Sequence, residues 1–377
     1  MKPRVLFCRS NPIAPDPRVE KEALALEEAG YAVSLLGWDR SASHPVDGTV
    51  LGLPCHRLPI KSAYANGIHN LPALLRWELG LMSWLWRHRR NFDIIHACDF
   101  DTILPAILCK WICGKIVVYD IFDFYADHLR ATPVWLKKLI RWLDLRVVGW
   151  ADALILVDDS RRAQIAGSRP RRIAVIYNAP PDQPSAKSDE QTTTPQQGLR
   201  LAYIGLMQVE RGLWEMLSVL RRHSDWHLDL AGFGGDETTI RETAESLPNI
   251  HWHGRVLYDR ALALSAAADV LFATYDPAIP NHRYSSPNKL FEAMMLSKPI
   301  LVASDTNMDR IVQEENCGLV IPYGDEDALE TALQRLADDP ALRQELGANA
   351  RRAYENSYGW PQMSQRLQHL YAELPAP

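Results

Sequence analysis

Short apolar runs alternate with amphipathic segments along the first half of the chain. The runs expected to form strands are Arg4–Cys8, Ala32–Trp38, Asp93–Cys98, Lys115–Ile121, Ala153–Asp158 and Ile173–Tyr177. The helical pattern between the first two runs begins after Asp16-Pro17, which can cap a helix, and ends near Gly30. Buried strands separated by helices are typical of a parallel sheet with helices on both faces. The first half therefore predicts a doubly wound α/β domain.

A second series of strands and helices fills the second half. Its strands are predicted at Leu199–Ile204, His227–Ala231, Ile250–His253, Asp269–Thr274 and Ile300–Ala303. Its helices are predicted near Trp214–Arg222, Thr238–Leu247, Arg260–Ala267 and Pro287–Leu296, and the chain after Asp325 is helical to its end. Between the two series, Asp182–Gly198 is rich in Pro, Ser, Thr and Gln, which is typical of a linker. The sequence predicts two Rossmann-like domains, residues 1–181 and 199–359, the linker 182–198, and a last helix within 360–377 that packs back onto the first domain.

Composition places the chain among ordinary globular proteins. It has 377 residues, of which 47% are hydrophobic and 23% are charged, enough for two separate cores. No apolar stretch reaches membrane-spanning length, and the N-terminus lacks the apolar core of a signal peptide. The six cysteines show no C-x-x-C spacing, so we expect reduced thiols, no zinc site and a cytoplasmic location.

Charge is divided unevenly between the halves. Residues 1–180 hold 24 Lys+Arg and 18 Asp+Glu, a net charge of +6, and the remaining residues hold 17 and 28, a net charge of −11. This asymmetry predicts that the first half meets an anionic surface or an acidic ligand.

The segment 284–302 carries the clearest chemistry of the second half. Ser286 is expected to cap a helix that begins at Pro287, because proline needs no hydrogen-bond partner at that position. The positive end of such a helix, with Lys289 beside it, suits a phosphate or diphosphate. Glu292, three residues later on nearly the same face, can accept hydrogen bonds from sugar hydroxyls. The segment therefore predicts a nucleotide site.

Four stretches together resemble glycosyltransferase family 4. They are Asp16–Ala23 with Ala29–Val33, Tyr203–Gly205 followed by Glu210–Gly212, His253–Val256, and Glu292–Met295. Members of this family have the GT-B architecture, in which two Rossmann-like domains face a central cleft. They transfer a sugar from a nucleotide-sugar donor with retention of anomeric configuration. The resemblance covers nearly the whole chain and implies the same fold and activity here.

The resemblance also implies which residues form the site. The residues expected to bind the donor, a UDP-, GDP- or ADP-sugar, are Gly205, Arg211, Arg255, Ser286, Asn288, Lys289, Leu290 and Glu292. The residues expected to act in catalysis are Asp123, His128, Arg211 and Lys289. Departure of the nucleoside diphosphate builds negative charge on the β-phosphate, which Arg211 and Lys289 can stabilise. We therefore expect no metal and no cofactor beyond the donor.

The chain departs from the family pattern at several of these places. Leu206 and Arg211 stand where the family typically has arginine and lysine. The family's two glutamates lie eight positions apart; Tyr284 occupies the first position and Glu292 the second. Phe122 and Asp123 stand where a His-Glu type pair commonly follows the strand. These differences leave the donor class and the catalytic detail open.

Several polar residues of the first half admit two interpretations. Asp123, Asp127 and His128 follow a predicted strand and could orient a hydroxyl group, or could form a solvated loop. Arg18 opposes the dipole at a helix start, so either a ligand or Asp16 should compensate it. Asp99-Phe100-Asp101 resembles the metal-binding Asp-x-Asp motif of other glycosyltransferase folds, but a helix cap explains it as well.

Two segments rich in Trp and Arg, Leu71–Arg90 and Pro133–Trp150, read as basic amphipathic helices. Interfacial tryptophans and cations would dock such helices on an anionic membrane surface, and the first segment is the better candidate. The alternative is that the tryptophans fill the core of the domain.

The sequence thus predicts a cytoplasmic, retaining, metal-independent glycosyltransferase, peripheral at the inner face of the membrane, that extends a lipid-linked glycan or polysaccharide. Nothing indicates nucleic-acid binding. One alternative is a sugar-nucleotide epimerase of similar fold. Another is a catalytically silent nucleotide-sugar-binding partner, which the departures at Leu206, Tyr284 and Phe122 would suit.

Overall fold

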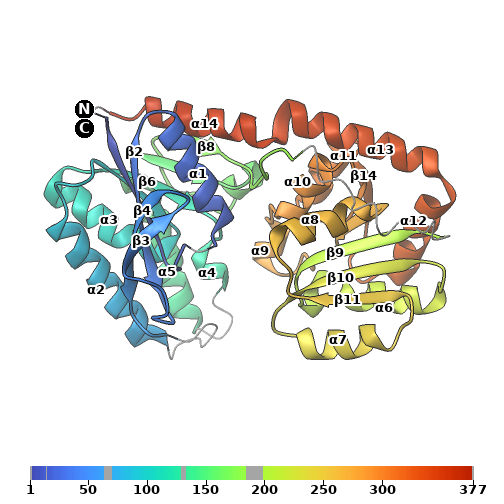
Figure 1. The fold of residues 1–377 in the computed structure, drawn as a ribbon. Helices are drawn as coiled ribbons and strands as arrows, with labels where there is room; N and C mark the ends of the chain where they lie inside the picture. Colours follow the sequence, from blue (N-terminus) through green and yellow to red (C-terminus); the bar gives the residue numbers. More distant parts are fainter. Residues whose placement is uncertain (1, 14, 63–69, 129–132, 184–197, 376–377) are drawn as a thin grey trace. The chain divides into compact units, whose positions relative to one another are not determined.

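The structure is a computed structural model that describes residues 2–13, 15–62, 70–128, 133–183 and 198–375, without the side chains of 127 and 128. The chain forms two compact units. The first comprises Met1–Tyr177 together with Met363–Pro377, and the second comprises Asn178–Gln362. Each unit contains one largely parallel sheet with helices (Figure 1). The predicted fold class of two Rossmann-like domains is therefore confirmed, whereas most of the predicted linker lies outside the described residues.

The first unit is built on an eight-stranded sheet in the order β3-β4-β2-β1-β5-β6-β7-β8. Its strands are β1 Arg4–Arg9, β2 Ala32–Asp39, β3 Asp47–Val50, β4 Leu53–Pro59, β5 Ile94–Cys98, β6 Ile116–Ile121, β7 Ala153–Leu156 and β8 Ile173–Val175. All neighbours pair in parallel except β3 and β4. The β3–β4 hairpin was not predicted, because β3 is short and mostly polar, and β4 contains two prolines and charged or polar residues between its apolar ones.

Helices of the first unit lie on both faces of the sheet. They are α1 Pro17–Glu28, α2 Leu71–Arg87, α3 Phe100–Cys113, α4 Tyr125–His128, α5 Val134–Trp150 and the C-terminal α14 Trp360–Ala372. As predicted, Asp16 caps α1 by accepting from the amide of Val19, and Gly30 follows its end at φ +94°. Alternate residues of β1, β5 and β6 pack with α2, α3 and α5 in one apolar cluster. The other face of the sheet meets α1 and α14.

The last helix belongs to the first unit, as the sequence predicted. The buried residues of α14 are Met363, Leu367, Leu370 and Tyr371, and the side chain of Gln368 donates to the carbonyl of Ala25 at the end of α1. Figure 1 shows α14, in red, beside α1. Where the chain leaves this unit, the amide of Tyr177 lies 3.2 Å from the sulfur of Met363, where the chain returns.

The second unit contains an all-parallel six-stranded sheet in the order β11-β10-β9-β12-β13-β14. Its strands are β9 Arg200–Leu206, β10 His227–Phe233, β11 Ile250–Gly254, β12 Val270–Ala273, β13 Ile300–Ala303 and β14 Gly318–Ile321. Its helices are α6 Leu213–Arg222, α7 Glu237–Glu245, α8 Tyr258–Ala267, α9 Pro280–Arg283, α10 Asn288–Met295, α11 Met308–Glu314, α12 Glu326–Asp338 and α13 Pro340–Ala353. The predicted strands are all present, and β14 is an additional one.

Each sheet has a point where the strand order reverses. In the first unit β1 lies between β2 and β5, and in the second unit β9 lies between β10 and β12. At such a point the connections from two adjacent strands of one sheet run to opposite faces, and open α/β sheets bind ligands at the carboxyl ends of these strands. The topology thus marks one candidate region in each unit.

Among the described residues, no helix combines the length and the apolar character that a membrane span requires.

Candidate functional site

The candidate donor site lies at the reversal point of the second sheet. Gly205 and Leu206 end β9, and a short turn, Val209–Arg211, follows before α6. Tyr275 comes two residues after β12, and the loop from there leads into α10. Adjacent parallel strands therefore bring the Arg211 turn and the start of α10 to the same edge of the sheet.

Two cations meet aromatic rings at this edge. The ammonium nitrogen of Lys289 lies 3.0 Å from the ring centre of Tyr203 and 5.9 Å from that of Tyr275. The guanidinium carbon of Arg211 lies 4.4 Å from the same Tyr275 ring. A side chain at Gly205 would place its first carbon 3.1 Å from the lysine nitrogen. The structure thus brings Gly205, Arg211 and Lys289 together, as the sequence predicted.

The environment of Lys289 disfavours its positive charge. Burial is the largest cause, and the charge of Arg211 adds to it, so that the pKa of Lys289 is held well below its usual value despite the opposing effect of Glu292. The lysine nitrogen has no hydrogen-bond partner among the described residues. A buried amine beside a second cation is a ready site for an anion.

Unpaired polar atoms are concentrated in the segment that leads into α10. The solvent-shielded atoms without a hydrogen-bond partner within the described part of the chain include both side-chain polar atoms of Asn281, Nδ1 of His282, Oγ of Ser286, Oδ1 of Asn288 and Nζ of Lys289. Buried polar groups are almost always hydrogen-bonded in folded proteins. A cluster of exceptions within nine consecutive residues indicates a ligand with several acceptors and donors.

Asn281 and His282 were not predicted from the sequence. Burial and the nearby charge of Arg211 lower the pKa of His282 to about 4, so the ring is neutral at physiological pH. Its ring centre lies 5.2 Å from that of Tyr275. No motif or spacing marks these two residues, and only their burial in the fold distinguishes them.

Two details of α10 correct the prediction. The helix begins at Asn288, one residue later than expected, because Pro287 is extended with ψ 146°. Ser286 therefore does not cap it. Leu290 is fully buried in the core and its amide donates to the carbonyl of Pro287, so it is not placed to bind a ligand.

Glu292 lies one turn beyond Lys289. Burial and then the charge and hydrogen bond of Glu292 raise the pKa of Tyr258, whose side chain is 41% exposed. The carboxylate therefore has a hydroxyl donor in this structure, and a ligand hydroxyl could take the same role.

Arg255 follows β11 and is exposed. Its guanidinium carbon lies 4.6 Å from the ring centre of Phe233, which ends β10 and is 44% exposed. An exposed arginine on an exposed aromatic ring forms a flat surface on which a planar group can stack.

In the first unit, Arg9, Asp99 and Asp123 meet at the carboxyl ends of β1, β5 and β6. Arg9 pairs with Asp99 and with Asp16, and its guanidinium carbon lies 4.1 Å from the ring centre of Phe122. Asp99, at φ +65°, accepts from the amides of Phe122 and Asp123 rather than capping α3. Burial raises the pKa of Asp99 to about 6, although Arg9 opposes the shift.

Asp123 forms an ion pair with Arg161 at 2.9 Å and is 42% exposed. Its side chain is thus held in place while it can still reach a ligand. His128 ends α4, and its side chain, like that of Asp127, is outside the described residues. The helix-cap interpretation of Asp99 is wrong, because its carboxylate is engaged by Arg9 and by two backbone amides.

Arg18 was expected to pair with Asp16 or a ligand, and this expectation is wrong. The residue is 4% exposed, and its guanidinium binds Asp120 and the carbonyl of Ile176 and lies 3.0 Å from Glu22. Within the described residues, the group of three potential metal ligands is Glu22, His96 and Asp120 in the first unit, and none is found around Lys289.

Both halves of the chain match families of known proteins. Residues 15–179 match the model described as "Glycosyl transferase 4-like domain", and residues 199–339 match "Glycosyl transferases group 1". The chain belongs to the family 4 glycosyltransferases. Together the two matches cover most of the chain, and they confirm both the predicted family and the predicted enzyme class.

Individual relatives agree with this assignment. The α-D-kanosaminyltransferase of Streptomyces kanamyceticus is 22% identical over 79% of this chain and 83% of its own length. The capsular polysaccharide glycosyltransferase CapM of Staphylococcus aureus is 29% identical over 24% of each chain.

Solved structures share the fold. Sucrose-phosphate synthase of Thermosynechococcus elongatus superposes with a TM-score of 0.81 over 99% of both chains at 16% identity. Anabaena Alr3699/HepE, solved in complex with UDP-glucose, has a TM-score of 0.72 over 98% of this chain and all of its own at 14% identity. This glycosyltransferase therefore has the GT-B fold class.

The Arg211 turn depends on Gly212, which yields a test of the site. Gly212 has φ +69°, and an added methyl carbon would lie 2.1 Å from Oγ1 and 2.7 Å from the carbonyl oxygen of Thr274, next to Tyr275. We predict that Gly212→Ala destabilises the second unit and displaces Arg211 from Tyr275. In urea unfolding of the full chain, the free energy of unfolding should fall by more than the strain of a left-handed alanine, which is about 1–2 kcal/mol.

Gly324→Ala is the matched control. Gly324 has φ +77°, but a methyl group there would meet nothing within 4 Å. The free energy of unfolding of this variant should fall only by the strain of a left-handed alanine. Equal losses in the two variants would show that the segment at Thr274 moves aside easily, and the close approach would then not hold the Arg211 turn.

Proposed function

We propose that this glycosyltransferase moves a sugar from a nucleotide-sugar donor to a lipid-linked glycan or polysaccharide, with retention of configuration and without a metal ion. The observation that carries the proposal is the pair of neighbouring basic residues, Arg211 and Lys289, together with four further residues of the same segment that have unpaired buried polar atoms. A nucleoside diphosphate with its sugar supplies the negative charge and the hydroxyl groups that such a site lacks. The binding of UDP-glucose by a protein of the same fold supports this choice.

The donor would bind in parts. The diphosphate would take the charges of Arg211 and Lys289 and the first amides of α10, which have no partner within the helix. Glu292 would accept from the ribose hydroxyls in place of Tyr258. The flat surface of Phe233 and Arg255 would meet the base, and Asn281 and His282 would bind the sugar or the phosphates.

Transfer would then proceed on one face of the sugar. The bond between the anomeric carbon and the phosphate oxygen breaks, the acceptor oxygen bonds to the same carbon, and the acceptor proton passes to the departing phosphate. Arg211 and Lys289 would stabilise the charge that develops on that phosphate. Asp123 of the first unit, held by Arg161, would orient a hydroxyl group of the acceptor or the sugar.

Calorimetric titration of UDP-, GDP- and ADP-sugars, followed by assays of diphosphate release and transfer in EDTA, tests this function. We expect one class of donor to bind, and Glu292→Ala to weaken its binding about 10- to 100-fold, as for a lost hydrogen bond to a charged group. Glu345→Ala, at an exposed position of α13, is the control and should bind normally. Binding of no donor, or transfer that requires a metal, would contradict the proposal.

The low pKa of Lys289 predicts proton uptake on donor binding. The diphosphate favours the charged lysine and so raises its pKa, which means that the complex holds more protons than the free protein. Affinity should therefore fall as pH rises above the pKa of the free lysine. Titration in two buffers of different ionisation enthalpy measures the uptake. Lys289→Arg, whose side chain stays charged, should bind without it, and equal uptake in both proteins would assign the proton to another group.

We further propose that α2, α3 and α5 of the first unit rest on an anionic membrane. Neighbouring contacts join α2 to α3 and α3 to α5. The tryptophans that are exposed among the described residues all belong to them: Trp86 49%, Trp111 56%, Trp135 68% and Trp142 53%. Trp77 is fully buried, so the core interpretation holds for only part of the set. The two exposed tryptophans of α5 are more exposed than Trp86, the exposed tryptophan of the first segment. Exposed rings with Arg89 and Arg146 beside them suit the lipid headgroup region.

Vesicle sedimentation tests the membrane contact. The wild type should bind vesicles that contain phosphatidylglycerol, and its affinity should fall at high salt. The affinity of the double variant Trp135→Ser/Trp142→Ser should be lower than that of the wild type by about tenfold or more. Leu257→Ser, 84% exposed on the second unit, is the control and should bind as the wild type does. Equal binding of the double variant would contradict this role of α5.

A further inference from the structure

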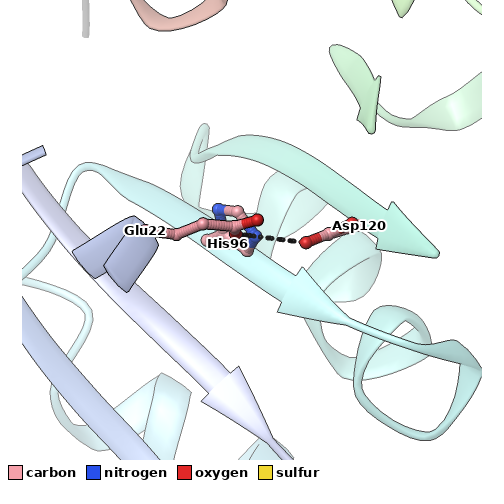
Figure 2. A group of neighbouring side chains, drawn as sticks. All are labelled: Glu22, His96 and Asp120. Carbon is pink, nitrogen blue, oxygen red and sulfur yellow. Dashed lines mark hydrogen bonds and ion pairs between the residues drawn. The ribbon is translucent and has the colours of Figure 1, made fainter. Parts of the chain in front are cut away.

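Three titratable side chains meet in the interior of the first unit, away from the proposed donor site. Glu22 projects from α1, His96 from β5 and Asp120 from β6, and each is fully buried (Figure 2). Nε2 of His96 lies 3.5 Å from Oε2 of Glu22 and 3.4 Å from Oδ2 of Asp120. The two carboxyl groups therefore converge on the same nitrogen of the imidazole.

The other side of the imidazole holds the C-terminal helix. The hydroxyl group of Tyr371, on α14, lies 2.7 Å from Nδ1 of His96. Tyr371 is 2% exposed, and its ring meets that of Tyr31 edge to face. Phe7 stacks on the imidazole at 4.1 Å. The cluster thus forms the polar part of the surface of the sheet on which α14 packs.

Hydrogen bonds to Asp120 leave Glu22 without a donor. Arg18 donates to both oxygens of Asp120 and to the carbonyl of Ile176. Its Nη2 lies 3.0 Å from Oε1 of Glu22, yet neither oxygen of Glu22 accepts a hydrogen bond from the described residues. An ionised carboxylate buried without donors is costly, whereas a protonated carboxyl can itself donate to the neighbouring carboxylate.

Charge balance distinguishes a proton from a metal ion in this cluster. Among the groups in direct contact, the two carboxylates and the guanidinium of Arg18 sum to one negative charge. A single proton neutralises it, whereas a divalent cation would leave one positive charge in the interior. A metal site also needs a path by which the ion can enter, and all three side chains of this cluster are fully buried.

We propose that Glu22 and Asp120 share one proton in the folded protein, and that this proton stabilises the packing of α14 on the sheet. Tyr371 then donates to Nδ1 of His96, and Nε2–H of the neutral imidazole faces Asp120. The carboxyl group of Glu22 also donates to Asp120, and Arg18 balances the one remaining charge. Loss of the proton would place two buried anions side by side beneath α14. The attachment of this helix is therefore sensitive to pH, independently of any donor.

The direction of this sensitivity follows from the groups that face the cluster. They are Arg18, Lys21 and Glu22 of α1, Tyr31 after it, His96 and Cys98 of β5, Asp120 of β6 and Tyr371 of α14. Burial raises the pKa of Glu22 well above its ordinary value of 4.5, and Asp120 adds to the shift although Arg18 and Lys21 oppose it. The unfolded chain thus loses this proton at a lower pH than the folded protein, so stability falls as pH rises from about 4.5 to the pKa of Glu22 in the folded state.

Glu22→Gln is the variant that tests the proposal. A glutamine has the shape of the protonated glutamate and can donate to Asp120, but it does not titrate. Hydrogen exchange of residues 363–375 in the full chain, corrected for the intrinsic rate, reports the attachment of α14. Within the window, the wild type should lose protection relative to the variant by about tenfold per pH unit. Tyr371→Phe should lower protection by a constant factor and leave the pH dependence unchanged.

Three results would overturn the shared proton. Equal pH dependence in the wild type and Glu22→Gln would show that Glu22 does not titrate in this window. Lower protection of Glu22→Gln at neutral pH would show that the ionised carboxylate is the stabilising form. Greater protection on adding Zn²⁺ or Mn²⁺, absent in Glu22→Gln, would show that a cation occupies the cluster.

A measurement on the wild type alone covers the case in which the variant fails to fold. Carbon-13 spectra of the glutamate carboxyl groups should show two that stay protonated at neutral pH. One is that of Glu78, whose pKa burial raises to about 8, and the other is that of Glu22. A protonated signal from Glu78 only would overturn the proposal.

Discussion

Positive charge without a matching anion is the constraint on which the second unit depends. Arg211 and Lys289 are held against the ring of Tyr275, and Tyr203 covers the lysine from the other side. Folding forces this arrangement, because Gly205 leaves room for the lysine and Gly212 lets the arginine turn approach Thr274. The sheet and its buried core supply the stability that keeps the two cations close together. An anionic ligand would supply the missing negative charge and so favour the protonated form of Lys289, which burial and Arg211 disfavour in the free protein.

Charged side chains at the reversal points of the two sheets differ in how they are paired. In the first unit, Arg9 has Asp16 and Asp99 as partners, and Asp123 has Arg161. Positive and negative groups are thus paired before any ligand arrives. In the second unit, Lys289 and several other buried polar side chains lack a hydrogen-bond partner among the described residues, and Arg211 donates to the uncharged side chain of Gln208. We infer that the second unit is prepared for a charged ligand and the first for a ligand that binds through hydroxyl groups.

The sequence was most informative where the structure is periodic. The buried parallel strands and the cap of α1 follow from apolar runs and from Asp16-Pro17, and the place of α14 was also foreseen. Two strands without an apolar run, β3 and β4, were missed, and so was β14, although its sequence is apolar. The start of α10 was misplaced by one residue because the conformation of Pro287, rather than residue type, decides it.

The sites show a similar division. Arg211 was predicted from its place in a family pattern and Lys289 from its place at the start of a predicted helix, and the structure brings the two together. Their role in donor binding stays a prediction. Asn281 and His282 have no pattern, since only burial and missing partners distinguish them. The pairing of Arg18 with Asp120 could not be found either, because Asp120 lies 102 positions away in the sequence. Long-range pairing of this kind is set by the sheet order and leaves no trace in local sequence.

The first unit is discontinuous in the chain, and this has a consequence for how the protein is made. Its sheet is complete after Tyr177, but the helix that covers one face begins to contribute only at Met363. A ribosome therefore finishes the whole second unit before it supplies Leu367 and Tyr371. Until then the residues on which α14 packs, with the carboxyl groups of Glu22 and Asp120 among them, are not covered by this helix. The first domain to be synthesised is thus the last to be completed, and chaperones that recognise exposed apolar surface have that interval in which to bind it.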